Sequence, residues 1–298
     1  MPQLSVTKVW NSENLQDAMP STAFARDQGL LRGWGVFETM LAVGSEVPLW
    51  SRHWARLQRG AQQLEIPLLP ELVFRQALQQ TLAVAATTLP QIRTAANCYR
   101  VRLTVTAGDG DLWMLPGETP MCVLSASSCA APLPLSEQSG LSLLTYPQPF
   151  FALPILQGCK HTSYLPWLMA ARYARHHGCD DAGLLDPTGN LIETSHRNLF
   201  VWRDERLWTP PLSSGCLPGI MRGLLLECAD RLGIRVCEQP LTLVDAMGAQ
   251  HIFLTSAVSV CQAVKKWDEQ SFPTSAWPQA LQDLEQELRR VLDVVPFG

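Results

Sequence analysis

The chain has 298 residues, of which 47% are hydrophobic and 17% are charged, and its formal net charge is −4. This composition, without any Lys/Arg-rich tract, argues against nucleic acid and anionic membrane surfaces as main partners. The nine cysteines are scattered, without Cys-x-x-Cys pairs, and the N-terminus lacks the pattern of a secretion signal. We therefore expect a cytoplasmic protein with free thiols, no metal site and no membrane span.

The first half of the chain predicts a small α/β domain. Residues 36–43 and 47–50 read as two strands around a Gly-Ser-Glu turn. A helix should follow with Ser51 as its cap, because Trp54 and Leu57 begin a helical repeat of apolar residues. The remaining elements expected in this half are a helix in 70–89 and strands in 98–110 and 119–128.

The second half predicts a larger α/β domain. The Pro- and Ser-rich segment 129–140 is the expected linker, which gives domains at 1–128 and 141–298. Thr162 and Ser163 should cap a helix that ends before Gly178. The other predicted elements are strands at 141–146, 181–186, 190–194, 198–209, 234–241 and 251–260, a helix at 217–233, and an amphipathic surface helix at 278–295.

A single lysine lies in a long segment that is otherwise almost uncharged. Between residues 112 and 172 the charged residues are Glu118, Glu137, Lys160 and Arg172. Apolar surroundings would lower the pKa of a buried amine and make it a nucleophile for a carbonyl or for pyridoxal phosphate. Taken alone, Lys160 would more often be a solvated lysine on a loop than a buried nucleophile.

Two further charged residues could serve the same chemistry. Glu193 follows an apolar strand, where it could cap a turn, pair with Arg197, or hold the proton of a pyridine nitrogen. Arg56 lies on the first helix and would suit a phosphate if it points inward, whereas a solvated arginine is the alternative. His53, one turn before it, is interpreted as a packing or capping histidine.

A helix start in the second half could bind a phosphate. Backbone N–H groups are free where "LPGIMR" enters a helix at Gly219–Ile220, although every helix has such a start. Thr255 and Ser256 place two hydroxyls at the end of a strand, where turn formation is the ordinary explanation.

In this order, the motifs resemble a known family. They are "GxGVFET", "HxxRL", an isolated lysine before a tyrosine-containing helix start, "DxxGxxxExxxxNLF", "TP", "LPGIMR" and a strand with "TSA". The set spans about residues 33–264 and resembles the class-IV aminotransferases, the fold-type IV pyridoxal-phosphate enzymes. The resemblance implies a two-domain α/β (α+β) fold like that of D-amino-acid aminotransferase. It also implies pyridoxal 5'-phosphate as cofactor, a small-molecule substrate and a homodimer.

The resemblance also implies a role for individual residues. Lys160 resembles the lysine that binds the cofactor's aldehyde and later shuttles the proton, and Glu193 the carboxylate on the pyridine nitrogen. Asn198 matches the family's "NLF" as a structural residue. The family's phosphate site is resembled by Arg56, the backbone of Ile220 and Met221, and the hydroxyl of Ser256. Tyr164 resembles a tyrosine near the ring hydroxyl. Thr39 resembles a residue near the substrate that assists proton transfer, and a plain strand residue is the alternative.

Within the family, "GVFET" and "KHxxYL" are more similar to 4-amino-4-deoxychorismate lyase than to branched-chain aminotransferases. This predicts a lyase that releases pyruvate and 4-aminobenzoate for folate biosynthesis. The alternative is an aminotransferase on branched-chain or D-amino acids, and the retained lysine, glutamate and arginine argue against a non-catalytic protein. Some lyases carry arginines in the loop after "TVT", where this chain has none. Asp109 and Asp111 would repel a substrate carboxylate that faced them, and Trp113 and Met114 favour a less charged substrate.

Overall fold

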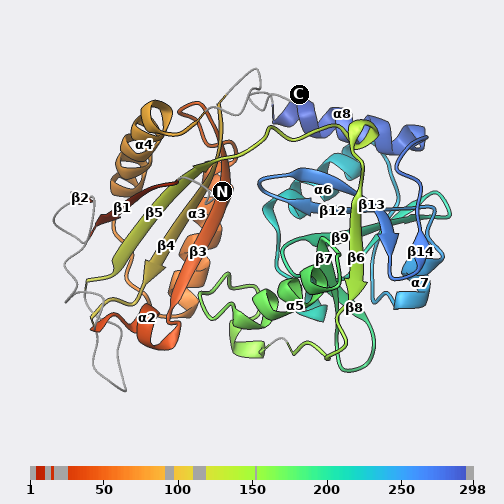
Figure 1. Ribbon diagram of the computed structural model, residues 1–298, viewed down its shortest axis with the longest axis horizontal. Helices are drawn as coiled ribbons and strands as arrows, with labels where there is room; N and C mark the ends of the chain where they lie inside the picture. The colour runs from red at the N-terminus through yellow and green to blue at the C-terminus, as the bar shows by residue number, and fades with distance from the viewer. Residues whose placement is uncertain are drawn as a thin grey trace. The chain divides into compact units, whose positions relative to one another are not determined.

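The computed structural model describes residues 5–10, 15–16, 26–90, 97–109, 119–151 and 153–292, and Figure 1 labels their helices and strands. Asp111, Trp113 and Met114, expected near the substrate, lie outside these ranges. The chain forms two compact units that are not continuous in sequence. Among the described residues, those up to Ala131 form the first unit together with Cys159–Tyr164, whereas Pro132–Gly158 and residues 165–292 form the second.

The first unit contains a five-stranded antiparallel sheet in the order β2-β1-β5-β4-β3, which leaves β3 at one edge. In the described part of this unit, three helices accompany the sheet. The strands are β1 (Ser5–Trp10), β2 (Leu15–Gln16), β3 (Gly35–Val43), β4 (Cys98–Thr106) and β5 (Met121–Ser128), and the helices are α2 (Gln28–Arg32), α3 (Trp50–Gln63) and α4 (Glu71–Thr88).

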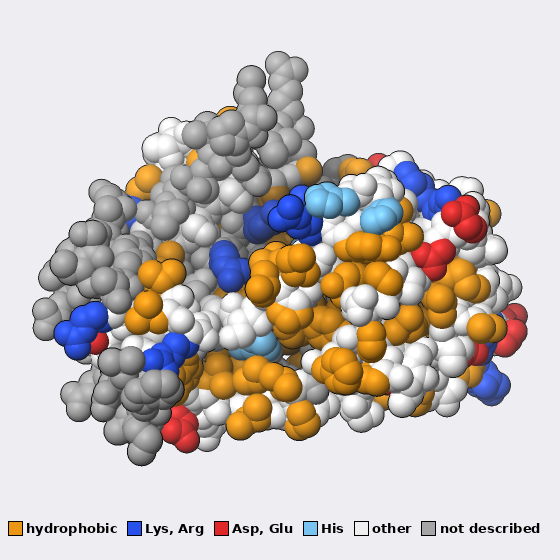
Figure 2. All heavy atoms as spheres, turned by 60° about the horizontal axis from the view of Figure 1, so that its bottom comes forward, with side chains coloured by type: hydrophobic (Ala, Val, Ile, Leu, Met, Phe, Trp, Pro, Cys, Tyr) orange, Lys and Arg blue, Asp and Glu red, His pale blue; other side chains and the backbone are white. Residues whose placement is uncertain are grey.

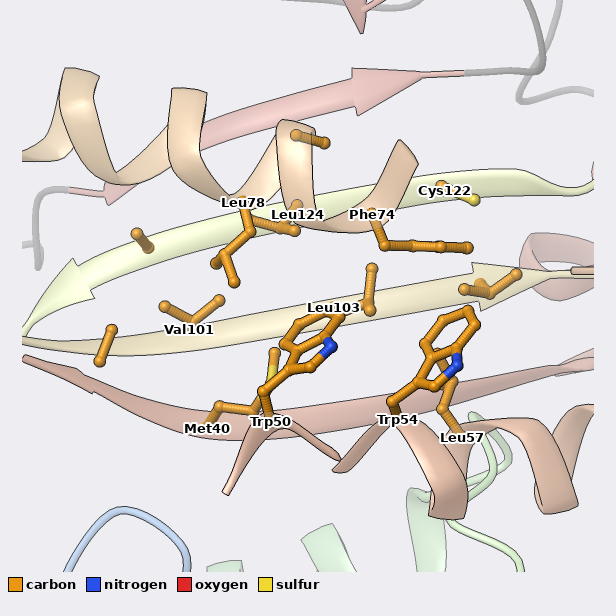
Figure 3. Packing of buried hydrophobic residues seen from close by; sticks show 14 of the residues in the cluster. Met40, Trp50, Trp54, Leu57, Phe74, Leu78, Val101, Leu103, Cys122 and Leu124 are labelled. Carbon is orange, nitrogen blue, oxygen red and sulfur yellow. The ribbon is translucent and has the colours of Figure 1, made fainter. Parts of the chain in front are cut away.

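The core of this unit lies between the sheet and its helices (Figure 3). The rings of Trp50 and Trp54 stack at 6.2 Å, and Trp54 lies 5.0 Å from the ring of Phe74 on α4. From β3, Val36 and Met40 join the same cluster, because alternate residues of a strand share one face. Burying each such large side chain stabilises the fold by about 1.5–3 kcal/mol.

Two predictions in this unit are wrong. Residues 47–50, predicted as a strand, form a turn that runs into α3. Pro48 has no N–H to donate to a ladder, and Leu49 is left-handed with φ 61°, so strand pairing ends at the bridge between Val43 and Glu46. Because α3 already begins at Trp50, Ser51 lies inside its first turn and is not the cap.

The second unit contains a nine-stranded mixed sheet in the order β11-β10-β9-β12-β13-β6-β7-β8, with β14 paired to β13. Its strands are β6 (Leu141–Thr145), β7 (Asp181–Leu185), β8 (Leu191–Thr194), β9 (Asn198–Arg203), β10 (Arg206–Thr209), β11 (Val236–Glu238), β12 (His251–Ser256), β13 (Val260–Trp267) and β14 (Gln270–Ser271). Its helices are α5 (Leu165–His176), α6 (Ile220–Arg231), α7 (Leu243–Met247) and α8 (Gln279–Val291), with single 3₁₀ turns η1 (Leu135–Glu137), η2 (Pro154–Leu156) and η3 (Leu212–Ser214).

Most of the predicted elements of this unit form, with two differences. The predicted strand 198–209 is a hairpin, because Asp204 and Glu205 both have positive φ and reverse the chain. The predicted strand 251–260 ends at Ser256, and its last residue, Val260, opens β13. The C-terminal amphipathic helix forms as α8, which buries Leu281, Leu284 and Leu288.

Large apolar side chains are exposed around η2 and α5. Figure 2 shows one face of the molecule, on which hydrophobic side chains gather in patches. The exposed residues of these segments are Phe151, Leu153, Ile155, Leu165, Leu168 and Met169. Such patches are typical of interaction surfaces, although the homodimer and the cytoplasmic location stay predictions. None of the helices in the described ranges is long and apolar enough to cross a bilayer.

Candidate active site

Lys160 lies on a short strand-like segment that pairs with the free edge of β3. The N–H of Phe37 donates to the carbonyl of Lys160 at 2.9 Å, and the N–H of Thr162 donates to the carbonyl of Gly35 at 2.8 Å. Val36 and His161 form the bridge between these bonds. The backbone of the lysine is therefore held against the edge of a sheet, and its side chain is half-buried.

The two hydroxyls after the lysine strengthen this attachment. Thr162 Oγ1 and Ser163 Oγ donate to the carbonyl of Gly33 at 2.7 and 3.1 Å. The prediction that they cap the following helix is wrong, because α5 begins at Leu165 and Tyr164 therefore occupies the N-cap position. They fasten the C-terminal flank of the Lys160 segment to the residues before β3.

The side chain of Lys160 lies over aromatic rings. Its amine is 4.5 Å from the ring centre of Phe37 and 5.7 Å from that of Tyr164, and the two rings meet edge to face at 5.4 Å. The guanidinium carbon of Arg102 is 3.7 Å from the same Phe37 ring. Thr39 lies on the same face of β3 as Phe37 and opposite Arg102 in the ladder. This face thus brings together an amine, a guanidinium, a hydroxyl and two rings.

On the other face of β3, Arg56 is joined to a buried carboxylate. Arg56 Nε and Nη2 donate to the two oxygens of Glu38 at 2.8 and 2.7 Å, and His53 Nδ1 lies 2.7 Å from Glu38 Oε2. All three side chains are at most 5% exposed. Arg56 therefore points inward, as its proposed role requires, and its orientation is set by a bidentate ion pair.

The ionisation of this triad follows from its contacts. Burial alone would raise the pKa of Glu38, but the charge and hydrogen bonds of Arg56 and the bond from His53 outweigh it and lower the pKa to about 2. Burial lowers the pKa of His53 from its ordinary range, against the opposing effect of Glu38. Near neutral pH the triad thus holds a carboxylate, a guanidinium and a neutral imidazole, which donates through Nδ1 because the carboxylate can only accept.

A glycine lets the helix of Arg56 approach the Lys160 segment closely. A Cβ placed on Gly60 would lie 3.2 Å from Cys159 Sγ and 3.3 Å from Val36 Cγ1. Arg56 and Gly60 are four residues apart and so lie on the same side of α3. Burial raises the pKa of Cys159 to about 11, so this thiol stays protonated and acts as a small packing residue.

In the second unit, Glu193 is held at the end of β8 by three neutral donors. Its Oε2 accepts from Asn198 Nδ2 at 3.2 Å and from the N–H of Leu217 at 3.1 Å, and its Oε1 accepts from Trp167 Nε1 at 3.3 Å. Arg197, the alternative partner considered from sequence, instead binds Asp181 at 2.6 Å. The carboxylate of Glu193 is thereby fixed in a defined plane.

Asn198 also connects Glu193 to the start of α6. Its Nδ2 donates to the carbonyl of Leu217 at 2.9 Å, and a Cβ on Gly219 would overlap its Oδ1. Gly219 is the N-cap of α6 and provides no side-chain cap. The N–H groups of Ile220 and Met221, in the first turn, have no acceptor within the helix. The carboxylate and this helix start therefore form one rigid assembly.

The hydroxyl of Ser256 takes part in a turn. Its Oγ lies 2.6 Å from Ser259 Oγ and accepts from the N–H of Ser259 at 3.1 Å, between β12 and β13. The neighbouring Thr255 Oγ1 is buried and has no hydrogen-bond partner in the described part of the chain. Burying a hydroxyl unpaired is unfavourable, and β12 packs against α6, so Thr255 suits an added ligand oxygen at least as well as Ser256.

Replacement of Gly219 by alanine tests the assembly around Glu193. The added methyl group should push Asn198 away, break its two donations, and destabilise the protein by about 1–3 kcal/mol. The matched control is Gly223→Ala in the same helix, where a Cβ meets nothing within 4 Å and a gain of about 0.5–1 kcal/mol is expected. Urea unfolding of both variants measures the difference, and equal stabilities would contradict the assembly.

Sequence reasoning missed three residues of these clusters. Glu38 and Arg102 were not assigned any role, and Trp167 was noted only as part of a helix. A signal existed for Glu38, because it shares the inward parity of Val36 and Met40 on β3 and faces a helix with a histidine and an arginine three residues apart. No sequence pattern marks the contact of Trp167 with Glu193, since the two lie on different elements.

These features define a class of protein: a fold-type IV pyridoxal-phosphate enzyme, with a two-sheet α/β fold. Residues 35–267 match the family described as amino-transferase class IV, and the chain belongs to it. Enzymes of this family use pyridoxal 5'-phosphate. The described residues fit that group, since they provide an amine, a fixed carboxylate, free helix N–H groups and the unpaired hydroxyl of Thr255.

Relatives of two activities are similar to this chain. A Methanocaldococcus jannaschii protein named "Putative branched-chain-amino-acid aminotransferase" is 30% identical over 255 residues, which are 85% of each chain. The aminodeoxychorismate lyase of Vibrio harveyi is 25% identical over 78% of this chain and 82% of its own. The crystal structure of 4-amino-4-deoxychorismate lyase from Pseudomonas aeruginosa has 27% identity and a TM-score of 0.75, covering 96% of this chain and 99% of its own.

Proposed function

We propose that this enzyme transfers the amino group of an amino acid with an apolar side chain, of the branched-chain kind, to a keto acid. The observation that carries the proposal is that the amine of Lys160 and the guanidinium of Arg102 lie on the same ring of Phe37. The likeness to the Methanocaldococcus jannaschii protein favours transfer over elimination. This proposal replaces the lyase preferred from sequence.

Arg102 is suited to the carboxylate of such a substrate. Its side chain is exposed and, within the described ranges, forms no ion pair with a protein carboxylate. Asp109, expected from sequence to repel a carboxylate, is paired with Arg26 at 3.0 Å. A guanidinium binds a carboxylate through two parallel hydrogen bonds, and the neighbouring rings of Phe37 and Tyr164 favour an apolar side chain.

The cofactor, when bound, supplies an electron sink for the carbon that bears the amine. Lys160 would hold the cofactor's aldehyde, and its amine, once released, would carry the proton from that carbon toward the cofactor. Glu193 would keep a proton on the ring nitrogen, in the orientation that its donors Asn198, Leu217 and Trp167 impose. The phosphate is assigned to Arg56, the N–H groups of Ile220 and Met221, and Ser256, with Tyr164 near the ring hydroxyl and Thr39 near the substrate.

The second candidate function is the lyase reaction on 4-amino-4-deoxychorismate. It is favoured by the Vibrio harveyi relative, which covers most of this chain, and by the "GVFET" and "KHxxYL" motifs. Lys160 would remove the same proton, and the enolpyruvyl group would leave as pyruvate. Arg102 could bind a carboxylate of either substrate, so this residue does not separate the two candidates.

Substrate assays separate them. Mixing the loaded enzyme with L-leucine, without any keto acid, should convert the bound cofactor to its amine form within one turnover, as absorbance shows. D-leucine serves as the matched control for handedness. Release of pyruvate from aminodeoxychorismate, without that spectral change on any amino acid, would instead establish the lyase. A protein that gains no visible absorbance with pyridoxal phosphate would contradict both functions.

A further inference from the structure

Trp167 donates to Oε1 of Glu193, whereas Asn198 donates to the other carboxylate oxygen. It lies in the first turn of α5, and its Nε1 is 3.3 Å from Glu193 Oε1. Its ring packs against Phe150 at 4.7 Å with an interplanar angle of 64°. The indole is thus positioned from two sides, by an aromatic contact and by a hydrogen bond.

Hydrogen bonds reach Glu193 at both of its carboxylate oxygens. Oε2 is held from the α6 side by Asn198 and by the N–H of Leu217, whereas Oε1 is held by Trp167 from α5. If only one oxygen accepted hydrogen bonds, the carboxylate could rotate about its Cγ–Cδ bond. The indole of Trp167 opposes this rotation because it donates to the other oxygen. A carboxylate must lie in the plane of a ring N–H to accept its proton well.

We propose that Trp167 is a positioning residue for the pyridine-binding carboxylate: it orients Glu193 toward the ring nitrogen of the cofactor. The inference rests on the proposed cofactor role of Glu193. It predicts that loss of the Trp167 N–H lowers cofactor affinity only by weakening the bond between Glu193 and the ring nitrogen. It also predicts that the indole lies two hydrogen-bond lengths from the cofactor ring, close enough for the cofactor to quench its fluorescence.

The test compares two cofactors on two variants. Trp167→Phe keeps an aromatic ring against Phe150 and removes the N–H, and we expect about tenfold weaker binding of pyridoxal 5'-phosphate, the effect of one hydrogen bond to a charged group. Binding of 1-deazapyridoxal 5'-phosphate, in which carbon replaces the ring nitrogen, should change less than about twofold. The control is Trp277→Phe, because Trp277 Nε1 donates to the carbonyl of Thr274 and should leave both affinities unchanged.

Fluorescence gives a second measurement on the same proteins. Part of the quenching on cofactor addition should be absent in Trp167→Phe and present in Trp277→Phe. Equal losses of affinity for both cofactors, or no loss for either, would overturn the proposal. Trp167→Tyr is the second variant; if neither folds by circular dichroism, Trp167 is a packing residue and the proposal fails. Failure of the unchanged enzyme to bind pyridoxal phosphate would instead refute the proposed function itself.

Discussion

Replacement of Lys160 by alanine is expected to abolish the covalent attachment of the cofactor and to lower turnover by about a thousandfold or more, as loss of a nucleophile does. The amine of Lys160 lies over Phe37 and Tyr164, and its backbone is held in a ladder by β3. Residual cofactor binding through Glu193 and the phosphate site should remain.

The chain is well suited to this measurement because it contains only four lysines, which are Lys8, Lys160, Lys265 and Lys266. Reduction with borohydride and peptide mapping should place the cofactor on the peptide that contains Lys160. Lys266→Ala is the matched control, since this exposed lysine contacts only the surface carboxylate of Glu269 among the interactions found for it. Cofactor mapped to another lysine, or retained by Lys160→Ala, would exclude the assigned role.

Replacement of Glu38 by glutamine should destabilise the protein by about 3–5 kcal/mol, the effect of removing one partner from a buried ion pair. The change leaves the guanidinium of Arg56 buried without its counter-charge and weakens the bond to His53. Glu71→Gln in the same unit is the matched control. Glu71 also accepts from an arginine and a tryptophan, but its side chain is 37% exposed, so a loss below about 1 kcal/mol is expected.

Urea unfolding measures these losses, and the double variant Glu38→Gln/Arg56→Met separates charge from packing. It should be more stable than Glu38→Gln, because the uncompensated charge is gone. A loss in Glu38→Gln as small as in Glu71→Gln would show that the triad is not the counter-charge system described above. The same variant should bind the cofactor more weakly if Arg56 holds the phosphate.

The triad also predicts how stability depends on pH. The pKa of Glu38 is lowered from 4.5 to about 2, so its contribution is present above pH 4.5 and is lost as the pH falls toward 2. Burial lowers the pKa of His53, so the unfolded chain takes up a proton near pH 6.5 that the folded chain does not. Both effects weaken the fold on acidification, and Glu38→Gln should flatten the part below pH 4.5.

Sequence patterns predicted those elements whose stability is local or strongly periodic. The helices at Glu71–Thr88 and Gln279–Val291 formed because one face of each is apolar. The segment 47–50 was misread because Val47 and Trp50 favour strands, while the left-handed Leu49 and the early start of α3 depend on packing. β13 was missed since the apolar run of 251–260 concealed the turn after Ser256.

The candidate site was predictable in chemistry and less so in geometry. The order of motifs identified the family, because reactive residue types recur there at fixed places in the chain. Glu38 was passed over because a carboxylate in a strand is ordinarily solvated, and only its pairing with Arg56 explains its burial. Arg102 and Trp167 act across elements, so their contacts exist only after the sheet and α5 have formed.

The segment Cys159–Tyr164 has a consequence for how this chain can be divided. It belongs to the first unit, although the residues on both sides of it belong to the second. A fragment that ends at Ala131 would leave the edge of β3 unpaired, and an unpaired edge is a template for aggregation. Any experiment that separates, exchanges or permutes the two units must therefore keep the six residues Cys159–Tyr164 with the first unit. Folding of the first unit must likewise wait until residue 164 has been synthesised.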